Sequence, residues 1–183
     1  AVAVEEEQAT LSKAYAFPIN SITLPPLRAL LMAKNINKIA HNVPFEDVWT
    51  RERLLFEDAW TRERLPFAVY PWTWCTQTAA HVLDNRPGIT GLKFQVYINF
   101  GIVDYDSHLT PFRRGVDEKN TNGFNRIAKA PLTDVLLYNG LDALYTYRLA
   151  ERQRHQMQRR GLMDAYQLFH NGMLALSRMS QNG

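Results

Sequence analysis

A phenol and a carboxylate lie four residues apart in the segment Tyr138-Asn139-Gly140-Leu141-Asp142. On a helix, residues 138 and 142 project from the same face about one turn apart. A carboxylate beside a phenol can hold a divalent metal and orient a water molecule. The alternative is a buried tyrosine bonded to a surface carboxylate. Gly140 costs about 1 kcal/mol relative to alanine in a helix interior, which predicts that another group approaches the backbone closely there.

A second polar cluster joins a predicted strand to a predicted helix and has the sequence His41-Asn42-Val43-Pro44-Phe45-Glu46. It places an amide and a carboxylate at one end of a strand, where ligands bind in open α/β sheets. The alternative is a local role, in which Asn42 caps the helix and Glu46 in the first turn complements the helix dipole.

The elements that must position these clusters follow from apolar spacing and from turn residues. Strands come early and helices later, which predicts an α/β fold with a mostly helical C-terminal half. The predicted strands are 1–4, 14–19, 37–40 and 71–74, and the predicted helices are 24–34, 44–65, 76–83, 91–100, 133–160 and 163–179.

Cap residues mark several boundaries of these elements. Thr90 and Thr133 are the expected N-caps of the two helices that start beside them, and Gly161 is expected to end the second of these helices. The polar stretch 101–131, rich in Gly and Asn, predicts a loop with little regular structure.

The composition is that of a globular protein. Of 183 residues, 46% are hydrophobic and 21% are charged, which excludes a disordered chain. No apolar run approaches the ~20 residues of a membrane span, and the first residues lack the basic stretch of a secretory signal. The single cysteine, Cys75, can form no internal disulfide, which favours a reducing intracellular compartment. We expect it to be a packed residue, because no histidine partner is evident.

The net charge of +3 is too small an excess to indicate nucleic acid. Basic residues do gather between Arg148 and Arg160, where Glu151 is the one acid. Such a helix end can contact phosphates. The alternative is a solvated face whose cations complement the C-terminal dipole.

An internal duplication lengthens the helix predicted after residue 44. Phe45–Leu55 is followed by Phe56–Pro66, with a period of 11 residues and nine identical positions. Eleven residues make three helical turns plus about 20°, so the insertion extends a helix by about 16 Å without rotating its buried face. Two copies are too few for a solenoid, so we interpret the repeat as a tolerated tandem duplication.

Taken in order, the two clusters resemble motifs of the 3′→5′ proofreading exonuclease domain of family A DNA polymerases, in the DEDDy branch of the DnaQ-like, RNase H-like superfamily. That family's second motif is a strand ending in HN or QN, two residues, an aromatic and an acid, as in 41–46. Its third motif is Tyr, three residues and Asp, as in 138–142. Segments 74–86 and 91–95 are similar to phage-type and bacterial polymerases, and 168–183 resembles the helix that leads into the polymerase domain.

This resemblance implies an RNase H-like exonuclease fold, with a mixed sheet flanked by helices. Residues 1–161 would form the exonuclease-like domain, and 162–183 would lead toward a polymerase domain in cis. The implied reaction is phosphodiester hydrolysis at the 3′ end of single-stranded DNA, with two Mg²⁺ or Mn²⁺ ions about 4 Å apart. The implied location is the cytoplasm of a bacterial or phage-infected cell, without a membrane.

The resemblance also assigns roles to residues. Asp142 and Glu46 would be metal ligands, and Tyr138 would orient the attacking water. Asn42 would contact the frayed strand, and Phe45 would line its channel. The residues expected to contact nucleic acid are His41, Asn42, Phe45 and Arg86.

The chain departs from the family pattern in its acids. The Asp-x-Glu of the first motif, which supplies two of the four acids, does not occur, and residues 1–19 resemble the second and third strands. We therefore expect an N-terminally truncated domain. Glu46 stands where the superfamily has Asp, and Asp47, which points about 100° away around the helix, is the fallback ligand. Only the first copy of the duplication follows the predicted strand 37–40, which favours Glu46 over Glu57 as the metal ligand.

Two other functions stay open. A catalytically incomplete exonuclease-like domain could act as a scaffold or single-strand binder, which the missing Asp-x-Glu favours. An RNA exonuclease of the RNase D type shares the DEDDy pattern, but the polymerase-like middle segment argues against it.

Overall fold

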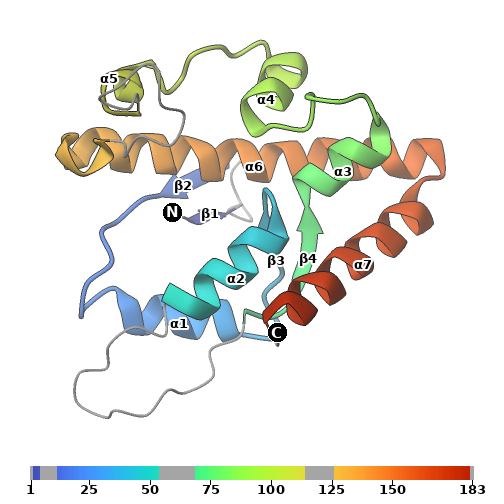
Figure 1. The fold of residues 1–183 in the computed structure, drawn as a ribbon, viewed down its shortest axis with the longest axis horizontal. Coiled ribbons are helices and arrows are strands. Elements are labelled where there is room, and N and C mark those ends of the chain that lie inside the picture. Colours follow the sequence, from blue (N-terminus) through green and yellow to red (C-terminus); the bar gives the residue numbers. More distant parts are fainter. Residues whose placement is uncertain (1, 5–11, 54–68, 114–125, 182–183) are drawn as a thin grey trace.

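The structure, a computed structural model, describes residues 2–4, 12–53, 69–113 and 126–181. It confirms a mixed α/β fold in which helices predominate (Figure 1). The elements are β1 (Val2–Val4), β2 (Lys13–Tyr15), α1 (Leu24–Met32), β3 (Lys38–Ala40), α2 (Val43–Arg53), β4 (Trp72–Cys75), α3 (Thr76–Leu83), α4 (Leu92–Phe100), η1 (Ser107–Leu109), α5 (Thr110–Arg113), η2 (Ile127–Lys129), α6 (Leu132–Arg160) and α7 (Met163–Gln181).

Most of these elements pack against α6, a helix of 29 residues. Its partners are β1, β2, β3, α3, α4, η1 and α7. In Figure 1, α4 and α5 lie along one side of α6, and the strands, α1 and α2 lie along the other side. At 1.5 Å per residue α6 is about 43 Å long. It therefore connects segments that are far apart in the sequence.

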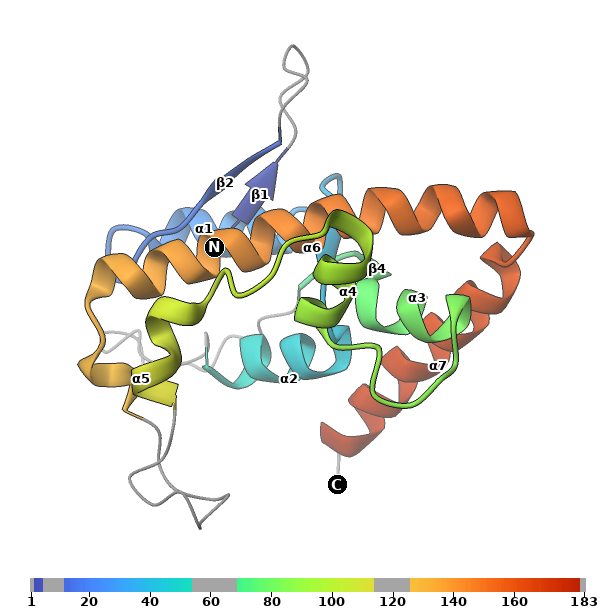
Figure 2. The same cartoon turned by 90° about the horizontal axis from the view of Figure 1, so that it is seen from above.

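The strands form two separate pairs in the described part of the chain. β1 and β2 are antiparallel, with Ala3 opposite Ala14, whereas β3 and β4 are parallel, with Ala40 opposite Cys75. The β1–β2 pair extends to one side of α6, while α2, α3 and α7 lie to the other (Figure 2). The single mixed sheet implied by the resemblance is therefore not formed by the described residues, because no backbone ladder joins the two pairs.

The hydrophobic core lies between the β3–β4 pair, α3, α6 and α7. Trp74 stacks on Tyr166, with ring centroids 4.1 Å apart. The fully buried Gln153 accepts a hydrogen bond from the Trp74 indole (3.2 Å) and donates one to the Thr76 carbonyl (2.9 Å). Because its amide is paired on both sides, this polar side chain is accommodated in the core without the cost of an unsatisfied group.

Cys75 is buried at the end of β4, as expected for a packed residue. Its sulfur accepts backbone N–H groups of Val43 (3.4 Å) and Thr78 (3.5 Å). It therefore helps to fix the starts of both α2 and α3.

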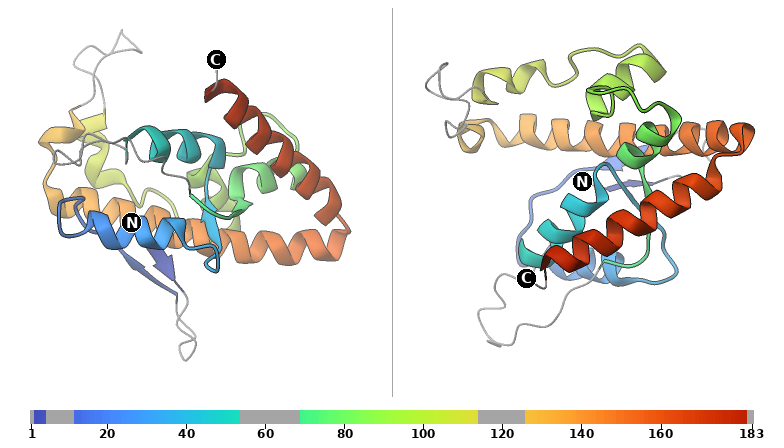
Figure 3. Two further views of the ribbon diagram at one scale, coloured as in Figure 1. Left: turned by 90° about the horizontal axis from the view of Figure 1, so that it is seen from below. Right: turned by 45° about the vertical axis from the view of Figure 1, so that its right-hand side comes forward.

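Helices α2 and α7 lie side by side (Figure 3). The Ser177 hydroxyl on α7 donates to the Pro44 carbonyl on α2 at 3.3 Å. The first turn of α2 is thus held by the last element of the fold.

Some predicted boundaries hold and others are wrong. Gly161 ends α6 in the left-handed conformation (φ 66°), as predicted. Thr133 is not the N-cap, because Pro131 precedes a helix that already begins at Leu132. Thr90 is not a cap either, since Gly91 in an extended conformation precedes α4.

The stretch 101–131 contains more regular structure than predicted, namely η1, α5 and η2 in its described residues. Helix α2 is described as far as Arg53. The predicted continuation to residue 65, with the second copy of the duplication, lies outside the described residues. In the described segments, no helix combines the length and apolar character that crossing a membrane requires.

Candidate functional site

Tyr138 and Asp142 lie on the face of α6 that points away from the β1–β2 pair. Gly140 lies against Ala16, the residue after β2, and a Cβ added at Gly140 would be 3.6 Å from that of Ala16. Residues two positions away are rotated by about 200° around a helix. Tyr138 and Asp142 therefore project from the opposite side. The predicted close approach at Gly140 exists, but at an ordinary contact distance that an alanine would also satisfy.

Two phenols lie beside the Asp142 carboxylate. The Tyr105 hydroxyl donates to Asp142 Oδ1 at 2.6 Å. Burial and a hydrogen bond to Asp142 raise the pKa of Tyr138 to about 12, and the same two causes raise the pKa of Tyr105. Both phenols therefore stay protonated near neutral pH, and the Tyr105 hydroxyl is the donor whose bond to the carboxylate has hydrogen-bond geometry. Their rings lie nearly parallel, with centroids 6.5 Å apart.

Two cations stand beside these rings. The Arg113 guanidinium carbon lies 4.4 Å from the centroid of the Tyr138 ring, and Lys93 Nζ lies 6.0 Å from it. Both cations donate to the carboxylate of Asp106, which is buried. Burial opposes ionisation of Asp106, but the hydrogen bond from Lys93 and the two positive charges outweigh it and leave its pKa below the usual range.

These groups border an open pocket of about 310 Å³. It is lined by residues 91–94 at the start of α4 together with Tyr105, Tyr138 and Asp142. The pocket thus combines a carboxylate, two hydroxyl donors and the lysine of α4. These are groups that can bind and orient a polar, anionic substrate.

A second cavity of about 410 Å³ lies between the β3–β4 pair, α6 and α7. Its charged residues Glu151 and Arg154 form an ion pair with each other, and Arg154 also lies 5.1 Å from the centre of the Trp74 ring. Because these two charges pair with each other and none of the predicted site residues lines this cavity, we place the candidate site at the smaller pocket.

The cluster at residues 41–46 occupies the junction between β3 and α2, as predicted. Asn42 has a left-handed backbone (φ 64°), which asparagine tolerates better than most residues. Its carbonyl accepts the N–H groups of Phe45 (3.0 Å) and Glu46 (3.1 Å). These are the first backbone bonds of α2, so Asn42 marks the start of the helix through its carbonyl group.

His41 and Glu46 are both half-buried at this junction. His41 Nδ1 lies 2.9 Å from the Thr76 hydroxyl oxygen, and burial lowers the pKa of His41 to about 4. The imidazole is thus neutral at physiological pH and gives no charge to a phosphate. Burial raises the pKa of Glu46.

The neighbours of Glu46 on α2 differ sharply in exposure. Phe45 is 58% exposed and is available to a ligand. Asp47 is 1% exposed, and its Oδ1 accepts the indole N–H of Trp72 at 2.9 Å. Asp47 is therefore a structural acceptor in the interior, which argues against it as a fallback metal ligand.

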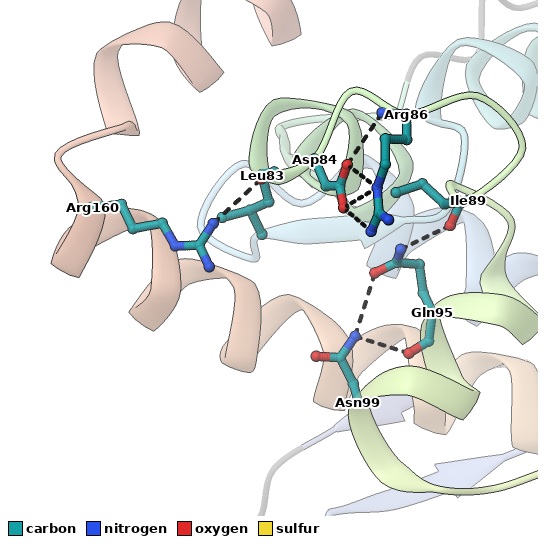
Figure 4. A network of polar contacts seen from close by, with 7 residues as sticks. All are labelled: Leu83, Asp84, Arg86, Ile89, Gln95, Asn99 and Arg160. Carbon is teal, nitrogen blue, oxygen red and sulfur yellow. Dashed lines mark hydrogen bonds and ion pairs between the residues drawn. The ribbon is translucent and has the colours of Figure 1, made fainter.

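Arg86 lies in the connection between α3 and α4, where it is paired with Asp84. Its Nε is 3.0 Å from both carboxylate oxygens, and its Nη2 is 2.6 Å from Oδ2 (Figure 4). The hydrogen bond from Arg86 lowers the pKa of Asp84. The guanidinium remains exposed. The same connection is tied to α4 by the Gln95 amide, which donates to the Ile89 carbonyl at 2.8 Å.

The predicted site residues thus lie in two places. Tyr138 and Asp142 meet at the pocket, whereas Glu46 lies on α2, which packs against α7 and the β3–β4 pair. Among the described residues, no group of three or more His, Cys, Asp or Glu side chains gathers as a metal site would require.

Sequence reasoning missed four residues at the pocket: Lys93 and Tyr105, which line it, and Asp106 and Arg113, which lie beside it. Three of them come from the stretch predicted as a plain loop. None lies at a helical or strand spacing from Tyr138 that would indicate a contact with it. The available signal was local, since the run Asp104-Tyr105-Asp106 places acids and an aromatic together. Loop residues of this kind often carry function.

Comparison of the chain with protein-family models gave no match. Comparison with curated proteins gave none either. The functional assignment below therefore depends on the motifs and on the geometry of the pocket.

Proposed function

We propose that the chain is the 3′→5′ exonuclease domain of a family A DNA polymerase, which removes nucleotides from the 3′ end of single-stranded DNA. The observation that carries this proposal is the Tyr138–Asp142 pair, whose side chains meet at one pocket beside two cations. This agrees with the hydrolytic role that the resemblance gives to a tyrosine and an aspartate at this spacing.

The residues of the pocket have distinct roles in this proposal. Asp142 is the acid at the reaction centre, and the Tyr105 hydroxyl fixes its orientation through the 2.6 Å hydrogen bond. Tyr138, whose pKa is raised to about 12, keeps its proton, and its hydroxyl oxygen would accept a hydrogen bond from the attacking water and so orient it. Phe45, being exposed, offers a surface on which an unpaired base can stack.

The type of donor at this site fits a divalent ion. Carboxylate oxygens are the ligands that Mg²⁺ and Mn²⁺ prefer, so Asp142 would serve at the pocket. The proposal also requires Glu46, which lies on α2 outside the pocket lining, to come to the same ions. Such ions supply an activated water and stabilise the leaving 3′ oxygen. The proposal assigns the other ligands to an Asp-x-Glu strand of a longer polypeptide. The two unjoined strand pairs agree with an additional strand, because a mixed sheet that lacks a strand between β1–β2 and β3–β4 would leave two such pairs.

The test is Mg²⁺-dependent degradation of 3′-labelled single-stranded DNA, measured for the chain alone and for a polypeptide extended by the Asp-x-Glu strand. We expect little or no cleavage by the chain alone and clear cleavage by the extended form. In the extended form, Asp142→Ala, Glu46→Ala and Tyr138→Phe should each lower the rate by orders of magnitude.

Two matched controls accompany these variants. Glu57→Ala, in the second copy of the duplication, and Asp164→Ala, at an exposed position of α7, should leave the rate unchanged. An extended protein that folds but never cleaves would refute the proposal. Cleavage of RNA in preference to DNA would instead indicate the RNase D type.

A second candidate function is single-strand binding without catalysis. It is favoured by the two cations that lie beside the stacked rings of Tyr105 and Tyr138. Binding of an oligonucleotide by the extended form with no cleavage at any Mg²⁺ or Mn²⁺ concentration would select this function.

A further inference from the structure

Two cations share one carboxylate beside the pocket, and the pocket itself holds the carboxylate of Asp142. Lys93 on α4 and Arg113 on α5 both donate to the same oxygen, Oδ2 of Asp106. One carboxylate neutralises one cation. The three side chains together therefore carry one net positive charge.

The exposure of the three groups shows where this charge is directed. The Asp106 side chain is 10% exposed, whereas the side chains of Lys93 and Arg113 are 48% and 31% exposed. A lysine has three N–H donors and an arginine five, so the bonds to Asp106 use a minority of them. The carboxylate thus faces inward and orients two cations whose other donors are open to a ligand.

The position of the cations restricts the kind of ligand. Arg113 lies over the ring of Tyr138 at 4.4 Å, and Lys93 lines the same pocket as Tyr138 and Asp142. Asp106 joins α4 to α5 by accepting one bond from a cation on each helix, and it leaves further donors on both cations. Partly exposed donors of a lysine and an arginine beside the reacting groups suit the oxygens of a phosphate that binds at the rim.

We propose that Lys93 and Arg113, oriented by Asp106, form a binding site for a backbone phosphate of the single strand whose end enters the pocket. This inference rests on the proposed function, because it places a nucleic-acid strand at the Tyr138–Asp142 pair. It assigns affinity to these two cations and leaves the hydrolytic step to other residues.

The test is equilibrium binding of a 5′-fluorescein-labelled ten-residue oligothymidylate, followed by fluorescence anisotropy in EDTA so that no hydrolysis occurs. Each phosphate contact with a single strand contributes about 0.7 to the slope of log K against log salt. At 0.1 M salt one contact is therefore worth about a fivefold change in affinity, since 0.1 raised to −0.7 is about 5. Lys93→Gln and Arg113→Gln should each weaken binding about fivefold and reduce the slope by about 0.7.

Matched variants separate this effect from total charge. Lys34→Gln, at an exposed position beyond the end of α1, should bind like the wild type. Lys93→Arg should keep the wild-type slope because it keeps the charge.

A measurement on the wild type avoids any dependence on folding of the variants. Acetylation of lysines by an amine-reactive ester, read by mass spectrometry, should be slowed by the oligonucleotide at Lys93 and not at Lys34. Equal protection of the two lysines, or Gln variants with the wild-type slope, would overturn the inference.

Failure of the inference can be told from failure of the proposed function. If the extended protein cleaves DNA while Lys93→Gln and Arg113→Gln bind normally, the phosphate site is wrong and the exonuclease proposal stands. If the slope changes as expected but no cleavage is ever seen, the site is supported and the hydrolytic function is refuted. If the wild type binds no oligonucleotide, the inference is overturned.

Discussion

The hydroxyl of Tyr105 provides a direct test of the geometry at the pocket. Tyr105→Phe removes the donor that lies 2.6 Å from Asp142 Oδ1 and keeps the ring that packs beside Tyr138. A hydrogen bond to an ionised acceptor contributes about 1.5–3 kcal/mol. Because Tyr105 and Asp142 are half-buried, we expect the substitution to lower the free energy of unfolding by about 2 kcal/mol.

Urea denaturation followed by circular dichroism measures this free energy, and a thermal scan gives an independent value. For a protein of this size, 1 kcal/mol shifts Tm by about 2–4 °C, so Tyr105→Phe should lower Tm by about 4–8 °C. The matched control is Tyr97→Phe on α4, where the tyrosine is 53% exposed. It should stay within about 0.5 kcal/mol of the wild type.

A double-mutant cycle identifies the acceptor. Tyr105→Phe combined with Asp142→Ala should be less destabilising than the sum of the two changes, with a coupling of about 1.5 kcal/mol or more. Additive effects, or a Tyr105→Phe protein as stable as the wild type, would show that this hydrogen bond does not hold Asp142.

Three further predictions concern other positions. Gly140→Ala should stabilise the fold by about 1 kcal/mol in urea denaturation, since its new Cβ would meet Ala16 at 3.6 Å, and destabilisation would contradict that packing. Because burial lowers the pKa of His41 from 6.5 to about 4, the unfolded state binds more protons between these values, and stability should rise with pH across this window. The change is about 3 kcal/mol at most, and His41→Asn should abolish it in melts at a series of pH values. Asp47→Ala should lower the free energy of unfolding by about 1–3 kcal/mol, because it leaves the Trp72 indole N–H unpaired. Asp47→Asn keeps an acceptor oxygen and should lose much less stability. Equal effects of the two changes would argue against the hydrogen bond.

The helices were predictable because their signals are local. The apolar stripe of α6 and the glycine at position 161 specify a long helix and its end without reference to the rest of the chain. The N-caps were predicted less well, because Pro131 and Gly91 begin their helices through backbone conformation and leave Thr133 and Thr90 without that role. Strand pairing depends on contacts between distant segments, which explains why two separate pairs were not foreseen.

The difference between local signals and contacts of distant segments also applies to the candidate site. Tyr138 and Asp142 were recognisable because a spacing of four residues on a helix places side chains together. Tyr105 contacts Asp142 across 37 positions of sequence, and no periodic pattern signals such a contact. Residues that are adjacent in sequence can have different roles. Asp47 adjoins Glu46 and yet points into the interior toward Trp72.

The two unjoined strand pairs also affect how the protein behaves at high concentration. Each two-stranded sheet has two outer edges, so within the described segments the pairs present four edges where one joined sheet would present two. Unpaired strand edges are templates for association with other chains. A strand that joined the pairs would remove two of these edges. Light scattering at rising concentration should therefore reveal less self-association in the extended protein, a readout that needs no enzymatic assay.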